Sequence, residues 1–169
     1  MKNTKRNVLI IVLVLVAGMI IWLMTQDWDQ RRIRKNLDLL AAAVYKPRGI
    51  TIQGVDLFKR VAILRKVIAA DCIIAPGEPV PQITGLDEVC GLFAQGINMV
   101  AELKVVFKDV TLTMAPGRAS ATATMTAEGI GTDLQGGPKQ YDAREIEMTW
   151  KKIEGKWKIA EVKEIKTLH

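Results

Sequence analysis

An uninterrupted apolar run near the N-terminus constrains this chain more than any other feature. Residues 8–24 read VLIIVLVLVAGMIIWLM, with no charged residue and no proline. At about 1.5 Å rise per residue, a helix of this length is an apolar rod of roughly 25 Å, close to the thickness of the hydrocarbon core of a bilayer. Trp22 and Trp28 flank its far end, and tryptophan favours the membrane interface. The sequence therefore predicts a transmembrane anchor over residues 8–25.

A cleaved secretory signal is the alternative interpretation of the same segment. Lys2, Lys5 and Arg6 form the charged start that signals and anchors share. Cleavage needs small residues directly after the apolar core, whereas residues 22–24 read Trp-Leu-Met. We therefore expect the segment to stay attached as a single-pass anchor.

Basic residues on both sides of the run bear on its orientation. Residues 1–7 carry three of them, and a second group that includes Arg31 and Arg32 begins several residues beyond the membrane exit. We expect residues 1–7 to be a short cytoplasmic tail and residues 26–169 a periplasmic domain of a bacterial inner-membrane protein. Arg31 and Arg32 are expected to meet anionic headgroups, the alternative being a solvated helix face.

The composition outside the run excludes several classes of function. The chain of 169 residues has a net charge of +6, and no basic run is interleaved with aromatic residues, so we expect no nucleic-acid partner. Its one histidine is the C-terminal residue, and it has two cysteines, so we expect no metal site and no cofactor. Cys72 and Cys90 are either a disulfide or two buried thiols, because spacing alone does not fix their distance.

Hydrophobic periodicity predicts helices first and antiparallel strands afterwards. Apolar residues recur at helical spacing up to residue 44, again over 55–68, and over 86–97, while alternation begins at residue 102. The alternation slips at Lys108-Asp109, which predicts a β-bulge that bends a long strand. Residues 129–138 are glycine-rich and predict a loop. The expected fold class is α+β, with about three helices packed on a curved, mostly antiparallel sheet.

This order of elements resembles the nuclear transport factor 2-like superfamily, over roughly residues 30–168. The matching segments are TGLDEV (84–89), VVFKDVTL (105–112), ATAT (121–124) and MTWKKIEGKWKI (148–159). The resemblance implies a cone-shaped domain behind the anchor. It also implies a cavity that the superfamily uses for isomerases and dehydratases, and for binding or scaffolding domains that often dimerise through the sheet.

The resemblance also suggests candidate pocket residues. Enzymes of the superfamily place Asp, His or Tyr inside the cone, and this chain has no interior histidine. The nearest acids are Asp71 and Asp142, which are either pocket bases or solvated acids at strand ends. Arg144 either receives an anionic ligand or pairs with Asp142. Met148 and Trp150 share its strand face and either line the pocket or belong to the core.

From these features we expect a non-enzymatic, membrane-anchored domain for protein–protein contact or scaffolding in the cell envelope. The Ser/Thr face of residues 120–126 is polar but uncharged, which suits sheet-to-sheet contact in a homodimer or an envelope complex. One alternative is a tethered binder of a small apolar molecule. The other is an isomerase- or dehydratase-type enzyme.

Overall fold

The computed structural model describes the backbone of residues 2–135 and 137–165. Within the first helix it describes the side chains of residues 14–16, 18, 19 and 28 onward. The chain divides into two compact units, Met1–Lys35 and Asn36–His169. Helix α1 (Lys2–Val44) runs from the first unit into the second.

The first unit is helical. Most of the predicted anchor, with Trp22, lies outside the described side chains, and Trp28, Arg31 and Arg32 are exposed. Where side chains are described, we find no helix with the length and apolar character needed to cross a membrane. The structure therefore does not show the anchor that the sequence predicts.

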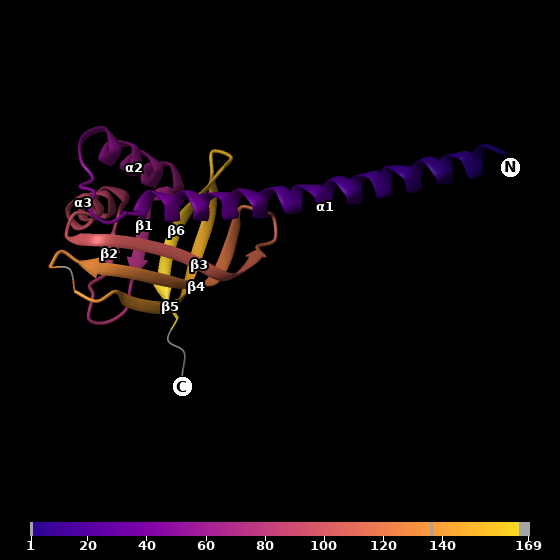
Figure 1. Ribbon diagram of the computed structural model, residues 1–169. Helices are drawn as coiled ribbons and strands as arrows, with labels where there is room; N and C mark the ends of the chain where they lie inside the picture. Colours follow the sequence, from indigo (N-terminus) through magenta and orange to yellow (C-terminus); the bar gives the residue numbers. More distant parts are fainter. Residues whose placement is uncertain (1, 136, 166–169) are drawn as a thin grey trace. The chain divides into compact units, whose positions relative to one another are not determined.

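The second unit is built on one curved, six-stranded sheet with the order β2-β1-β6-β5-β4-β3 (Figure 1). All neighbouring strands are antiparallel except β1 and β6, which are parallel. Helices α2 (Gly54–Val67) and α3 (Leu86–Gly96) contact each other and β1. The strands are β1 (Ile68–Ala75), β2 (Ile83–Thr84), β3 (Val100–Met114), β4 (Ser120–Asp133), β5 (Gln140–Ile153) and β6 (Lys156–Glu164). The predicted α+β class is confirmed.

The predicted β-bulge is present in β3. Its register with β4 shifts between Lys108 and Thr111, and Asp109 has a φ of 52°. The predicted loop over residues 129–138 is wrong in its first half. Gly129 and Gly131 pair with β3 on one side and β5 on the other, and this two-sided pairing extends β4 to Asp133 despite the poor strand propensity of glycine.

The core of this unit lies on one face of β4, β5 and β6. Ala121 and Ala123 pair with Trp150 and Met148, so small side chains on β4 stand beside large ones on β5. Trp150 is 0% exposed, and Ala121, Ala123 and Met148 are buried with it. The alanines leave the volume that the indole ring fills, which is why a strand so rich in alanine can line the core.

Helix α2 turns a different face inward than the periodicity predicts. Val55 and Phe58 are among the apolar residues that recur at helical spacing over 55–68, yet they are 71% and 73% exposed, while Leu64 and Val67 are buried. Arg60 gives the reason, because its Nη1 donates to the Ala43 and Tyr45 carbonyls, near the C-terminus of α1. Helix ends leave such carbonyls without an intrahelical donor. Because Arg60 faces these carbonyls, Phe58, two positions earlier on the helix, faces solvent.

Replacing Arg60 with methionine should lower the free energy of unfolding by about 1–3 kcal/mol, because two carbonyls lose a charged donor. The change can be measured by urea unfolding of the full chain in detergent. Arg65→Met is the matched control on the same helix, since Arg65 pairs with Asp87 at 2.7 Å in an exposed ion pair. Its effect should stay below about 1 kcal/mol. Equal effects of the two substitutions would contradict the role given to Arg60.

A buried lysine secures the connection between α1 and α2. Lys46 is 3% exposed, and its Nζ donates to Val100 O (2.7 Å), Ile97 O (3.1 Å) and Asn98 Oδ1 (3.3 Å). Asn98 in turn bonds both backbone groups of Ile52, with its Nδ2 donating at 2.7 Å and its Oδ1 accepting at 3.0 Å. The segment after α1 is thus fixed to the segment before β3.

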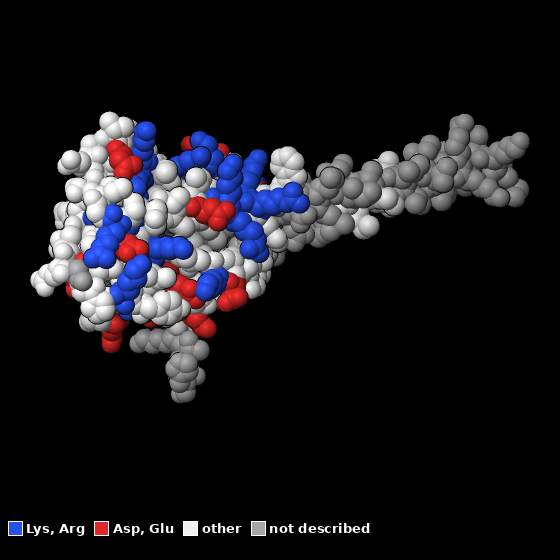
Figure 2. Space-filling view, in the orientation of Figure 1, with Lys and Arg blue, Asp and Glu red and all other residues white. Residues whose placement is uncertain are grey.

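The charged surface of this unit is extensively paired. Basic and acidic side chains are intermingled on the face in Figure 2. Lys108 contacts Glu128 at 2.7 Å, and Lys139 contacts Glu102 at 3.1 Å. Exposed pairs of this kind contribute little to stability, so the fold depends mainly on the core and on the buried hydrogen bonds.

Candidate functional site

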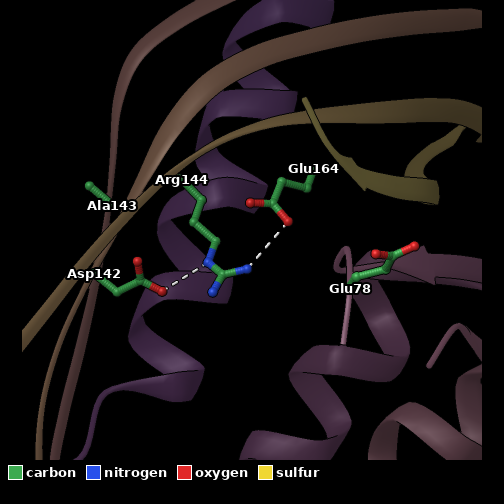
Figure 3. A pocket seen from close by; sticks show the side chains of 5 residues that line it. All are labelled: Glu78, Asp142, Ala143, Arg144 and Glu164. Atoms are coloured by element: carbon green, nitrogen blue, oxygen red, sulfur yellow. Dashed lines mark hydrogen bonds and ion pairs between the residues drawn. The ribbon is translucent and has the colours of Figure 1, made fainter. Parts of the chain in front are cut away.

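Two adjoining hollows open where β5 begins and where β1 and β6 end, and Figure 3 shows the residues that line the polar one. The polar hollow has a volume of about 480 Å³ and is lined by Glu78, Asp142, Ala143, Arg144 and Glu164. The apolar hollow has a volume of about 260 Å³ and is lined by Ile74, Ala75, Pro76, Val80, Arg144, Ile146, Val162 and Glu164. Arg144 and Glu164 line both, so we treat the two hollows together as one site, the mouth pocket.

Strand register explains why these side chains meet. Ile146 stands opposite Glu164 in the antiparallel β5–β6 pair, and Val162 stands beside Ile74 in the parallel β1–β6 pair. Directly paired residues project from the same face of a sheet. The apolar lining therefore comes from three strands that are neighbours in space, although β1 is far from β5 and β6 in sequence, and from Pro76 and Val80 of the loop after β1.

Arg144 is held between two carboxylates. Its Nε donates to Asp142 Oδ2 at 2.8 Å, and its Nη1 donates to Glu164 Oε2 at 3.3 Å and to Pro76 O at 3.4 Å (Figure 3). The hydrogen bond to Asp142, followed by the charges of both acids, raises the pKa of Arg144. The structure thus forms the pairing with Asp142 that the sequence offered as one alternative.

The loop after β1 approaches Glu164 closely. Gly77 has a φ of 87°, a conformation that glycine adopts without steric cost. A Cβ placed on Gly77 would lie only 2.0 Å from Glu164 Oε2. Glycine at this position therefore lets the loop close over the Glu164 carboxylate. Sequence reasoning missed this contact, although Glu164 continues the alternation of Val162 on the last strand.

The predicted site residues fall into two groups. Asp142 and Arg144 line the mouth pocket. Asp71 is exposed and lines neither hollow, because the β1–β6 register shifts between Ile68 and Ile73 and leaves Cys72 as the buried residue. Met148 and Trp150 share the face of Arg144 but lie deeper, inside the core, and line neither hollow. The Trp150 Nε1 atom has no hydrogen-bond partner among the described residues.

The two cysteines are free and buried, so the second of the two alternatives describes them. Burial is the largest cause that raises the pKa of each thiol. In the part of the chain that the structure describes, no group of three or more His, Cys, Asp or Glu side chains could hold a metal ion. Four charged side chains gather at the mouth pocket, those of Glu78, Asp142, Arg144 and Glu164.

Solved structures share this architecture, whereas no family model and no curated protein sequence matches the chain. A putative scytalone dehydratase from Novosphingobium aromaticivorans superposes with a TM-score of 0.68 at 14% identity, covering 85% of this chain and 87% of that one. A nuclear transport factor 2-like superfamily protein from Salmonella enterica gives 0.66 at 9% identity, covering 85% and 94%. The chain has a nuclear transport factor 2-like fold. A hexachlorocyclohexane dehydrochlorinase gives 0.65 at 13% identity, covering 82% and 88%.

The names of these structures correct one expectation. The sequence-based prediction that the chain is not an enzyme is wrong, because proteins named as dehydratases and as a dehydrochlorinase are among its structural neighbours. The prediction relied on the missing interior histidine. It weighed Asp71 and Asp142 as pocket bases or solvated acids, and it overlooked the Glu164 carboxylate, which lines the pocket from the last strand. At 9–16% identity the likeness shows the fold alone.

Proposed function

We propose that the chain binds a small molecule in the mouth pocket, with its apolar body against Ile74, Ile146 and Val162. Its polar group would then reach Arg144 and Glu164. The observation that carries this proposal is that these two charged residues line both hollows. Ligand sites combine an apolar lining with a few polar groups that fix orientation. An open, partly apolar hollow favours a ligand-binding function over a function in protein–protein contact alone.

Filling the apolar hollow tests the proposal. Ala75→Phe places a ring where the ligand body would lie, and it should weaken binding of cyclohexanol about tenfold or more, equivalent to about 1.4 kcal/mol. Binding can be measured by ligand-observed NMR with the full chain in nanodiscs. Ala62→Phe is the matched control, because Ala62 is exposed on α2 and lines neither hollow. Equal affinities of the two variants would overturn the proposal.

An elimination reaction in the same pocket is a second candidate. The dehydratase and dehydrochlorinase names among the neighbours favour it, together with the place of Glu164. A general base must be a carboxylate within reach of the bound molecule, and Glu164 borders the apolar hollow. Chloride release from hexachlorocyclohexane and loss of water from β-hydroxy ketones are suitable assays. Turnover that is lost in Glu164→Gln would support an elimination reaction. Absence of turnover with both the chlorinated substrate and the β-hydroxy ketones would oppose it.

We also propose that residues 8–25 hold this domain at a bacterial inner membrane, with residues 26–169 in the periplasm. The support is the length and apolar character of the run, and the tryptophans that flank it. Membranes washed at alkaline pH should retain the full chain, and protease added to spheroplasts should digest the domain. Release of the chain by the wash would overturn the anchor, and protection from protease would reverse the orientation.

A further inference from the structure

We infer that the ligand of the mouth pocket carries a positive charge, such as a protonated amine, beside its apolar body. The inference rests on the proposed function and specifies the chemical class of ligand. It is drawn from the charges around the two hollows and from the contacts that already occupy Arg144.

The polar hollow is negatively charged overall. Glu78, Asp142 and Glu164 provide three carboxylates against the single guanidinium of Arg144. Arg144 already contacts two of them, Asp142 at 2.8 Å and Glu164 at 3.3 Å. The described contacts include no hydrogen bond or ion pair of the Glu78 carboxylate. In Figure 3 that carboxylate lies across the gap from Arg144, on the loop that follows β1.

The apolar hollow places a ligand close to this negative charge. Its wall is formed by aliphatic side chains of β1, β5 and β6, and Glu164 stands at its rim beside Val162 and Ile146. The Glu164 side chain is only 25% exposed, so water screens its charge incompletely. A molecule that buries an apolar body here brings its own polar group next to a carboxylate, which favours a donor or a cation.

An anionic ligand would meet unfavourable conditions in the same place. Asp142 and Glu164 already contact the Nε and Nη1 atoms of Arg144, so an anion would either compete with these carboxylates or lie beside them, and both would repel it. Like charges brought together at a binding site oppose association, whereas opposite charges favour it. Of the two roles that the sequence offered for Arg144, receiving an anionic ligand is therefore less favoured than pairing with Asp142.

Three ligands of nearly equal shape test the inference: cyclohexylmethylamine, cyclohexylmethanol and cyclohexanecarboxylate. Their dissociation constants can be measured at pH 7 and low salt by ligand-observed NMR, with the full chain in nanodiscs of neutral lipid. We expect the amine to bind about tenfold more tightly than the alcohol, the carboxylate to bind most weakly, and added salt to weaken the amine selectively.

Charge-removing variants locate the effect. Glu164→Gln and Glu78→Gln should each reduce the preference for the amine over the alcohol, and Arg144→Met should increase it by leaving Asp142 and Glu164 without their cation. Glu154→Gln is the matched control, because Glu154 is exposed in the turn between β5 and β6 and lines neither hollow. Glu78 lies on an exposed loop, so its variant tests the inference even if Glu164→Gln disturbs folding.

The outcomes separate the inference from the proposal on which it rests. If the alcohol binds as tightly as the amine, or the carboxylate binds best, the inference of a cationic ligand is wrong, but the proposal that the mouth pocket binds a small molecule is retained. If none of the three ligands binds, both are wrong. If the amine still binds to Ala75→Phe with unchanged affinity, it is held by the charged surface outside the pocket, which also overturns the inference.

Discussion

Replacing Trp150 with alanine is expected to lower the free energy of unfolding by about 3–5 kcal/mol. The side chain is 0% exposed and is one of the two tryptophans among the fully buried side chains. Its partner across the β4–β5 pair is Ala121, which has no atoms that could move into the vacated space. Because the cavity would stay open, the loss of stability has two parts. One is the lost free energy of burying the ring, and the other is the cost of the empty cavity that remains. Urea unfolding followed by circular dichroism of the full chain in detergent measures it.

Two further variants show whether packing is the cause. Phe58→Ala also removes an aromatic ring, but that ring is 73% exposed, so the change should stay within about 0.5 kcal/mol. Trp150→Phe keeps an aromatic ring and removes an indole N–H that has no partner among the described residues, so it should cost less than alanine. A small effect of Trp150→Ala, similar to that of Phe58→Ala, would contradict the burial of Trp150.

Features that depend on a few consecutive residues could be predicted from the sequence. The slip at Lys108-Asp109 placed the bulge of β3, and the alternation around Met148 and Trp150 identified the buried face of β5. The matching segment 148–159 contains Glu154-Gly155, the turn between β5 and β6, in which both residues have positive φ. Each of these features depends on the alternation of side chains along one strand, or on the residues of one turn. Both can be recognised within one or two adjacent elements of the sequence.

Features that join distant segments could not be predicted in this way. The inward face of α2 depends on the end of α1, which lies 15 to 17 residues before Arg60. The mouth pocket joins Pro76 to Arg144 across 68 positions, and Glu164 to Arg144 across 20. Periodicity identifies which face of a strand is apolar, but it does not identify the neighbouring strand or its register. Asp142 and Arg144 were identified because they lie on the same alternating strand as Met148 and Trp150. Gly77 and Glu164 were missed because the sequence around each of them does not indicate that the two residues contact each other.

Lys46 is the largest of these omissions for stability, and Lys46→Met is expected to cost about 2–5 kcal/mol. Lys46 follows the helical spacing that stops at residue 44, and a lysine in a segment between two helices is normally solvated. Its ammonium group instead supplies hydrogen bonds to the Ile97 and Val100 carbonyls. Methionine fills a similar volume but leaves these carbonyls without that donor, and a buried group left unsatisfied costs about 1–3 kcal/mol. The measurement is again urea unfolding, at constant detergent concentration.

A matched control and a second variant separate this role from general effects of losing a lysine. Lys104→Met removes an exposed lysine from β3 and should change stability by less than about 0.5 kcal/mol. Asn98→Ala should destabilise the chain while leaving Lys46 in place, because Asn98 bonds both backbone groups of Ile52. The double variant should cost less than the sum of the two single variants, since Lys46 and Asn98 share a hydrogen bond at 3.3 Å. Strict additivity would show that the two residues act separately, and equal effects of Lys46→Met and Lys104→Met would show that Lys46 is solvated.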